Sequence, residues 1–432
     1  MSVTAAISPG TTGQADRRRS FAFWTSAAVV GHTLWTSAAP SLAYQIYAQQ
    51  WHLSSTTTTA LFAVYPVVVV VVLLVFGNLS DVVGRRAAMM LGVGFSIGGV
   101  ALFAAANDLT ALFAGRVLMG VGVGLSAGPS TAALIDFSPA RGTNIAATTA
   151  TVAQATGMSA ALLLSGALIQ YAPWPTRLSF IFLTVLLAAL LSVLKWLPRH
   201  RAPANWSQWR PSKPVVTTGD RRPFIVATAS ITTAYTHGAL LLALGGQIMH
   251  DLIGSSNVFG DAALLALFPM AFGAVGLLTR KVVPLVLVNW GAFGSFSGMA
   301  LLTSSVALHS WPLMVAAVVL SGAGYSAQVS GGLGTLATTG SSQHRGGILS
   351  AVLLVAYLAM GSCALLFGVI ATRWGLALAT DIGALTIACL SATAWVLANF
   401  RKRSALPNQP WAELPDTKPS PFPSHYSKGA SP

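Results

Sequence analysis

Charged side chains are scarce in this sequence of 432 residues, where 24 lysines and arginines and 10 acids make up 8% of the chain. Soluble domains carry about a quarter of their residues as charges. Hydrophobic residues reach 54%, and the mean hydropathy is +0.68. The shortage of charge therefore excludes a soluble globular domain and predicts a membrane protein.

Cysteine is nearly absent as well. Cys363 and Cys389 both fall within apolar runs, which argues against a disulfide framework and a zinc site. The acids and histidines are scattered, with no metal-spaced histidine cluster and no GxSxG nucleophile motif. We therefore expect neither an enzyme nor a cofactor or metal.

Long apolar runs with few charges are what the sequence does contain. A bilayer core about 30 Å thick needs roughly 20 apolar residues in a helix. Runs of this length lie at 21–44, 56–76, 87–106, 109–131, 145–170, 178–197, 223–245, 261–279, 282–304, 312–335, 347–371 and 376–398. They predict an all-α integral membrane protein with twelve transmembrane helices.

A polar, basic stretch divides these runs into six and six. We expect an N-terminal tail at 1–20, a six-helix half at 21–198, a linker at 199–222, a second half at 223–400 and a disordered tail at 401–432. His32 and His237 lie near the middle of matching helices of the two halves. Two halves in the same orientation indicate a pseudo-twofold axis along the membrane normal, with a substrate site between them.

The net charge of +14 follows the topology of the chain. Of the 24 lysines and arginines, all but Arg116, Arg177 and Arg373 fall on one side of the predicted membrane, in its loops, at a helix end or in the tails. This positive-inside bias places both termini in the cytoplasm of a multi-pass plasma-membrane (inner-membrane) protein. It also explains the basic charge without nucleic acid as a partner.

A charged loop, GNLSDVVGRR, follows the second run. It resembles the signature of the major facilitator superfamily through Gly77, Leu79, Asp81, Gly84, Arg85 and Arg86. A second stretch, LFAGRVLMGVG, is similar to the arginine motif of the fourth helix of that family through Leu112, Arg116, Gly120 and Gly122. The resemblance covers the helical region and implies a transporter with the fold of this superfamily.

The loop itself suggests a gate. Asp81 can accept hydrogen bonds from free amides at a helix start, where the helix dipole favours an anion. The resemblance implies that this start is that of the eleventh helix, near Gly347, and that Arg85 or Arg86 pairs with Asp136. Alternatively, the arginines merely satisfy the topology rule, and Asp136 is a solvated loop acid.

Ionisable groups inside the membrane are few, and such groups are functional candidates by default. His32 shares a helix face with Trp35, and His237 is its counterpart, so either can carry a proton or can simply bind a neighbouring helix. Arg116 can bind an anionic group, assist a proton step as the resemblance implies, or reach outward to Asp108. No acid lies in the middle of a predicted helix.

Uncharged polar residues provide further cavity candidates. They are Tyr65, Gln154, Tyr325, Gln328 and Tyr357. Any of them can instead hold helices together. The cavity that the sequence implies is aromatic and aliphatic, which suits apolar or amphipathic organic molecules.

The direction of transport is left open by the fifth helix. Drug–proton antiporters of this superfamily carry a Gly-Pro pair and a Gly-Gly pair there, whereas this chain keeps Gly157 and Gly166 but has Ala161, Leu162 and Ser165 at the other positions. We expect a monomeric, proton-coupled exporter of small organic molecules in the lipid bilayer. The alternatives are uptake of a small metabolite and a transport-inactive sensor or scaffold.

Overall fold

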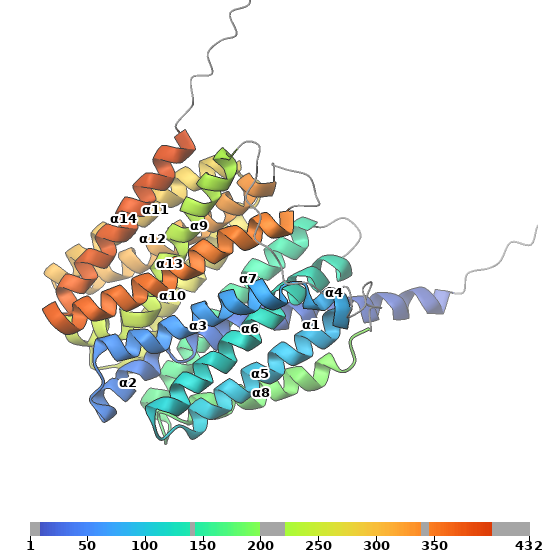
Figure 1. The fold of residues 1–432 in the computed structure, drawn as a ribbon, viewed down its shortest axis with the longest axis horizontal. Helices are drawn as coiled ribbons and strands as arrows, with labels where there is room; N and C mark the ends of the chain where they lie inside the picture. Colours follow the sequence, from blue (N-terminus) through green and yellow to red (C-terminus); the bar gives the residue numbers. More distant parts are fainter. Residues whose placement is uncertain (1–8, 139–142, 199–220, 338–344, 400–432) are drawn as a thin grey trace, which may run out of the picture. The chain divides into compact units, whose positions relative to one another are not determined.

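The protein is described here by a computed structural model, which covers residues 9–138, 143–198, 221–337 and 345–399. Within these ranges every regular element is a helix, and Figure 1 shows the helices from α1 to α14 along the chain. Most of the expected linker and the expected C-terminal tail fall outside the described residues.

Apart from the short elements α4 and η2, the helices correspond to the twelve predicted runs, and most ends differ by only a few residues. In the first half they are α1 (Pro9–Ala38), α2 (Ser41–Trp51), α3 (Ser55–Phe76), α4 (Leu79–Val83), α5 (Arg85–Ala105), α6 (Leu109–Phe137), α7 (Thr143–Tyr171) and α8 (Leu178–Leu194). In the second half they are α9 (Arg222–Gln247), the π-helix η2 (Ile248–Leu252), α10 (Val258–Leu278), α11 (Pro284–Ala307), α12 (Trp311–Ala337), α13 (Arg345–Trp374) and α14 (Leu376–Asn399). By length and composition, 10 of the described helices can cross a membrane, and α8 is an apolar helix of 17 residues.

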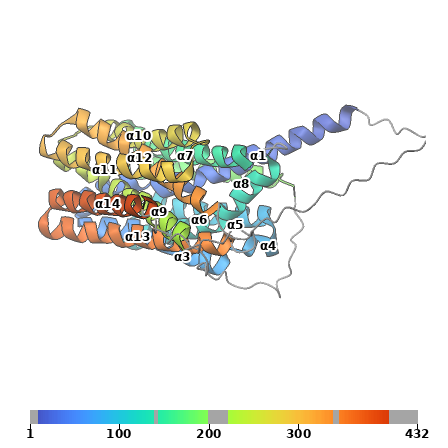
Figure 2. The same cartoon turned by 90° about the horizontal axis from the view of Figure 1, so that it is seen from above.

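The first predicted helix differs most from its structure. It begins at Pro9 rather than at residue 21, and its first turns extend beyond the neighbouring helices (Figure 2). It also breaks at Ala39 and Pro40, after which α2 continues. Proline lacks an amide hydrogen and its ring clashes with the preceding turn, which accounts for the break. A prediction from apolar runs alone passes over it, because Pro40 lies inside the run 21–44.

The packing repeats between the halves. Helix α1 packs against α6 and α7, as α9 packs against α12 and α13, and the α5–α6 pair matches the α11–α12 pair. The halves meet where α3 lies along α13 and where α7 lies along α10. A pseudo-twofold axis that relates two six-helix halves in the same orientation exchanges these contacts.

Candidate functional site

A central cavity of about 50 Å³ lies between the halves. Its walls come from α1, α3, α7, α9, α10, α12 and α13. The lining residues are Leu34, Ser37, Tyr65, Met158, Tyr235, Gly238, Leu242, Phe268, Phe272, Tyr325, Tyr357 and Met360. None of these side chains is charged, and the volume suffices for a few water molecules.

Tyr325 stands at the centre of the aromatic wall. Its ring centroid lies 5.4 Å from that of Phe268, 5.2 Å from that of Phe272 and 6.5 Å from that of Tyr235. Tyr235 in turn meets Tyr357 edge to face, with centroids 4.8 Å apart. These separations fall in the range that aromatic pairs favour, so the rings form one connected surface.

Two matched prolines position part of this wall. Tyr65 precedes Pro66 in α3 and Phe268 precedes Pro269 in α10, and each aromatic residue lies ten positions after the start of its helix. A proline inside a helix removes one backbone hydrogen bond and favours a kink. The repeated aromatic–proline pair is therefore a sequence signal that could have identified Phe268.

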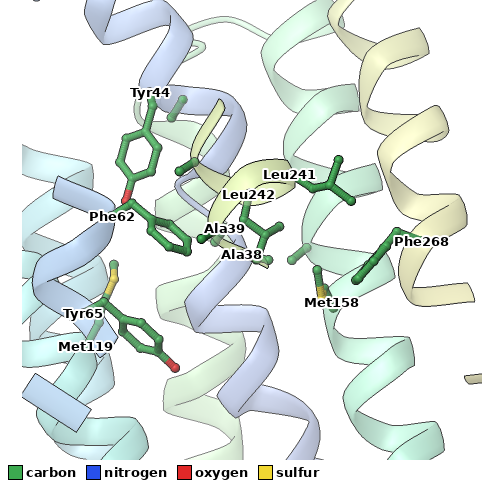
Figure 3. Close-up of a cluster of buried hydrophobic side chains, with 14 of the residues drawn as sticks. Ala38, Ala39, Tyr44, Phe62, Tyr65, Met119, Met158, Leu241, Leu242 and Phe268 are labelled. Carbon is green, nitrogen blue, oxygen red and sulfur yellow. The ribbon is translucent and has the colours of Figure 1, made fainter. Parts of the chain in front are cut away.

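The sequence prediction named Tyr65, Tyr325 and Tyr357, and all three line the cavity. Tyr235, Phe272 and Met158 were not predicted. Met158 of α7 lies beside Phe268 of α10 (Figure 3). Because α7 and α10 belong to different halves, only the packing of the halves brings these side chains together.

Arg116 is fully buried behind the cavity wall. Its guanidinium donates to the carbonyl oxygens of Leu61 (3.2 Å) and Ser37 (3.3 Å), and lies 4.8 Å from the ring centroid of Tyr65. The rings of Tyr44 and Phe62 are also within 6 Å, and Figure 3 shows all three aromatic residues near the break after α1.

The environment of Arg116 bears on its predicted roles. Ser37 belongs to the last turn of α1. The free carbonyls and the negative end of the helix dipole at this point stabilise a cation. Asp108 instead caps α6 through the amide of Ala111 (2.8 Å), and does not pair with Arg116. One guanidinium nitrogen, Nη2, has no hydrogen-bond partner among the described residues.

The two central histidines are buried next to the cavity but do not line it. The Nδ1 atom of His32 contacts the carbonyl of Val29, and Nε2 lies 3.4 Å from the hydroxyl of Ser96 in α5. The Nδ1 atom of His237 lies 3.0 Å from the carbonyl of Thr233, while its Nε2 has no described partner. This geometry fits helix contacts, and a proton role for either residue stays a prediction.

The other polar candidates occupy different positions. Gln328 donates to the hydroxyl of Ser295 in α11 (3.1 Å) and is fully buried. It therefore joins α12 to α11, although Tyr325 on the same helix faces the cavity. Gln154 and Trp35 are half-buried and lie outside the cavity lining.

The charged loop forms the short helix α4 and a turn. Gly84 adopts φ 84°, a left-handed conformation that favours glycine, and so allows α5 to begin at Arg85. Arg85 forms an ion pair with Asp136 and donates to the carbonyl of Ala132 (2.8 Å), while Arg86 donates to that of Leu197 (2.9 Å). These contacts tie the loop to the ends of α6 and α8.

Asp81 lies in the first turn of α4 and is exposed. No hydrogen bond joins its carboxylate to a described residue. The expected partner, the start of α13 near Gly347, directly follows residues 338–344, which fall outside the described ranges. Its gating role therefore stays a prediction.

The opposite end of the bundle joins the two halves directly. We call the end with the α3–α5 turn the Arg85 end, and the end where α3 begins the Thr56 end. At the Thr56 end, the amide and hydroxyl of Thr56 both donate to the hydroxyl of Thr372 (2.9 and 2.8 Å). Gln247 bonds to Ser55 (3.0 Å) and to Thr58 (3.2 Å), so the Thr56 end is closed by uncharged groups.

Two pseudo-symmetric helical halves around a cavity define a membrane transport protein rather than an enzyme. The family profile of the Major Facilitator Superfamily matches residues 24–296, more than half of the 432-residue chain, and the chain belongs to this family. The sequence-based prediction of this family and of its twelve-helix fold is confirmed. A sequence comparison with curated proteins gives no match.

Solved structures share the fold at low sequence identity. A mutant of the nucleoside transporter NupG has 12% identity and a TM-score of 0.69, over 88% of this chain and 99% of that chain. A POT family transporter in complex with 5-aminolevulinic acid has 12% identity and a TM-score of 0.68, over 88% and 96%. A bacterial homologue of the human lysosomal transporter Spinster, in an inward-facing and occupied conformation, has 14% and 0.65, over 88% and 96%.

Proposed function

We propose that this transporter exports apolar or amphipathic small organic molecules in exchange for protons, by alternating access. The observation that carries the proposal is the uncharged cavity lined by Tyr65, Tyr235, Tyr325, Tyr357 and aromatic or aliphatic neighbours. Such walls bind ring systems through apolar contact, and the tyrosine hydroxyls supply a few orienting hydrogen bonds.

The size of the cavity supports alternating access. A volume of about 50 Å³ is too small for an organic substrate of drug size, which needs roughly 300 Å³ or more. Substrate must therefore enter another conformation, in which one end has opened. We assign gating at the Arg85 end to Gly77, Asp81, Gly84, Arg85, Arg86 and Asp136, and place that end in the cytoplasm because of its basic loops.

A second candidate is uptake of a small anionic metabolite. The buried guanidinium of Arg116 favours this second function, because its Nη2 atom has no described hydrogen-bond partner. The ring of Tyr65 lies between the guanidinium and the cavity. Rotation of the Tyr65 ring would give a carboxylate or phosphate access to this donor. The similar folds include transporters named for a nucleoside and solved with 5-aminolevulinic acid.

Proton flux in proteoliposomes tests and separates the two. Vesicles with an acidic interior should lose their pH gradient faster when an exported amphipathic compound is added outside, because antiport moves protons out. An uptake symporter should instead respond when the exterior is acidic and an anionic compound is added. No response to a broad panel under either gradient contradicts proton coupling.

Variants of the aromatic wall provide the site-specific test. Tyr325→Ala removes the ring at the centre of the aromatic wall. The loss of one aromatic contact with substrate, worth about 0.5–1.5 kcal/mol, should weaken apparent substrate affinity roughly 2- to 12-fold. Phe293→Ala, at an exposed position in α11, is the matched aromatic control and should leave the affinity unchanged. Equal effects of the two variants would place substrate elsewhere.

A further inference from the structure

Asp261 is a buried carboxylate that the sequence did not single out. The eighth run was expected to begin at residue 261, which would place this acid at the membrane surface. Helix α10 instead begins at Val258, and the side chain of Asp261 is only 2% exposed. Its Oδ1 atom has no hydrogen-bond partner among the described residues.

The start of α10 explains only part of the position of this acid: Asp261 lies in the first turn, where the helix dipole favours an anion, but it does not cap the helix. Asn257 already caps α10, because its side chain accepts a hydrogen bond from the amide of Gly260 (3.0 Å). The carboxylate of Asp261 is therefore free of a capping role. A charged carboxylate that is buried with an unpaired oxygen is unfavourable, so this position suits an acid that can become neutral or hydrated.

A polar route connects Asp261 to the surface. Its polar neighbours are the hydroxyl of Ser255 and the imidazole of His250. His250 is exposed and lies on the π-helical turn η2, where its Nδ1 is 2.9 Å from the carbonyl of Ser255. Single π-helical turns occur frequently at functional sites.

Further ionisable side chains lie at the ends of the elements around α10. Asp251 follows His250 on η2, Tyr171 ends α7, and His309 precedes α12; all three are exposed. His250 is thus the ionisable group that acts on Asp261. Asp251 and His309 face solvent, and the ring of Tyr171 packs against Phe259 of α10, with centroids 5.8 Å apart.

The turn that carries Asp261 also closes the Thr56 end. The amide of Val258 donates to the side chain of Gln170 in α7 (2.9 Å), and a Cβ atom placed on Gly166 would lie 2.2 Å from Ala262. Residues on both sides of Asp261 therefore pack against the other half. Separation of α10 from α7 would admit water to this turn.

We propose that Asp261 is a proton-binding site of the transport cycle, loaded through His250 and Ser255, and that its protonation stabilises the closed Thr56 end. The proton passes from solution to the imidazole and then to a carboxylate oxygen, and the imidazole takes up another. The neutral carboxyl tolerates burial, whereas the carboxylate favours the hydrated, open state. The proposal rests on the alternating-access transport proposed above.

Spin-label distances across the Thr56 end test it without any substrate. Labels at the exposed positions Trp174 and Leu308, in the Cys363→Ser, Cys389→Ser protein in nanodiscs, report on the two halves. Acidification should raise the closed-to-open ratio by up to about tenfold per pH unit in the parent, as one linked proton allows. Asp261→Asn should hold the closed-to-open ratio near the value of the acidified parent, with less than a twofold change over the same range.

Asp251→Asn, on the neighbouring exposed turn, is the matched control and should keep the parent response. A parent-like pH response in Asp261→Asn, or its loss in Asp251→Asn, overturns the proposal. If Asp261→Asn fails to fold, Asp261→Glu replaces it as the test. The midpoint of its closed-to-open ratio against pH should differ from that of the parent, and an unchanged midpoint counts against the site. His250→Gln should slow closure after a pH jump without changing the end points.

Substrate counterflow separates this proposal from the proposed function. Asp261→Asn should retain exchange of a transported compound across vesicles without a pH gradient, yet lose accumulation driven by one. Absence of counterflow in the parent for every compound would contradict the proposed transport while leaving the distance measurement valid. Accumulation equal to the parent's in Asp261→Asn would overturn the proton site alone.

Discussion

At the scale of single residues, Arg116 acts first as a support for the helices around the cavity. Its two backbone acceptors lie in α3 and in the last turn of α1, next to the break at Pro40. A buried carbonyl that loses its donor costs free energy, and hydrogen bonds to charged groups contribute about 1.5–3 kcal/mol each. This position therefore couples a candidate binding group to the stability of the site.

The Arg116→Ala variant should lower the free energy of unfolding by more than about 2 kcal/mol, because the carbonyls of Leu61 and Ser37 lose hydrogen bonds from a charged group. Thermal melting in detergent measures the effect. Arg177→Ala is the matched control: Arg177 donates to Asn107 (2.8 Å) at an exposed position and should cost less than about 1 kcal/mol. Equal melting temperatures for the two variants would contradict a structural role for Arg116.

The ion pair between Arg85 and Asp136 should behave differently, because its side chains are 31% and 33% exposed. Pairs of this kind contribute about 0–1 kcal/mol to stability. Asp136→Asn should therefore leave the melting temperature nearly unchanged while altering how fast a membrane-impermeant maleimide labels a cysteine placed at Met158. The charge swap Arg85→Asp with Asp136→Arg should restore the parent rate, and an unaltered rate in Asp136→Asn would remove the pair from the gate.

At the scale of helices, small residues determine how closely α1 and α7 cross. A Cβ atom on Gly157 would lie 2.1 Å from the carbonyl oxygen of Gly31, so any side chain there must push the helices apart. Gly157 and Gly166 are the two positions that fit the fifth-helix pattern, and both make contacts between helices. Membrane helices commonly use such residues, since close packing replaces the hydrophobic effect there.

Gly157→Leu should reduce the free energy of unfolding by about 1–3 kcal/mol or more, the usual cost of overpacking. Gly128→Leu in α6 should be tolerated, because a Cβ atom on Gly128 has no neighbour within 4 Å. Thermal melting with size-exclusion profiles compares the two. Comparable stability of both variants would mean that α1 and α7 separate without cost.

The sequence could predict helices better than the faces they bury. Runs of about 20 apolar residues predicted the long helices from α3 to α14, most ends to within a few residues, because a bilayer dictates the length of a helix. The same apolarity removes the amphipathic period that separates core from surface in soluble helices, since lipid and protein interior are both apolar. Tyr235 and Phe272 were therefore missed, and Asp261 was placed at the surface.

At the scale of the whole molecule, the two halves close the Thr56 end through two seams. The α3–α13 seam brings Gly368 against Thr59, and the α7–α10 seam brings Gly166 against Ala262. If the halves move as rigid bodies, a wedge in either seam must open the same end of the transporter. The size of the shift follows from the free energy of the clash that closure creates.

Gly368→Val should therefore favour conformations that are open at the Thr56 end. A Cβ atom on Gly368 would lie 1.7 Å from the hydroxyl oxygen of Thr59, and overpacking by about 1–3 kcal/mol shifts an equilibrium roughly 5- to 150-fold. Maleimide labelling of Met158→Cys from that side should accelerate accordingly, and Gly166→Val should have the same effect through the other seam. Gly94→Val, with no neighbour within 4 Å, should label at the parent rate. Acceleration by one wedge but not the other would show that the halves bend, rather than rotate as units.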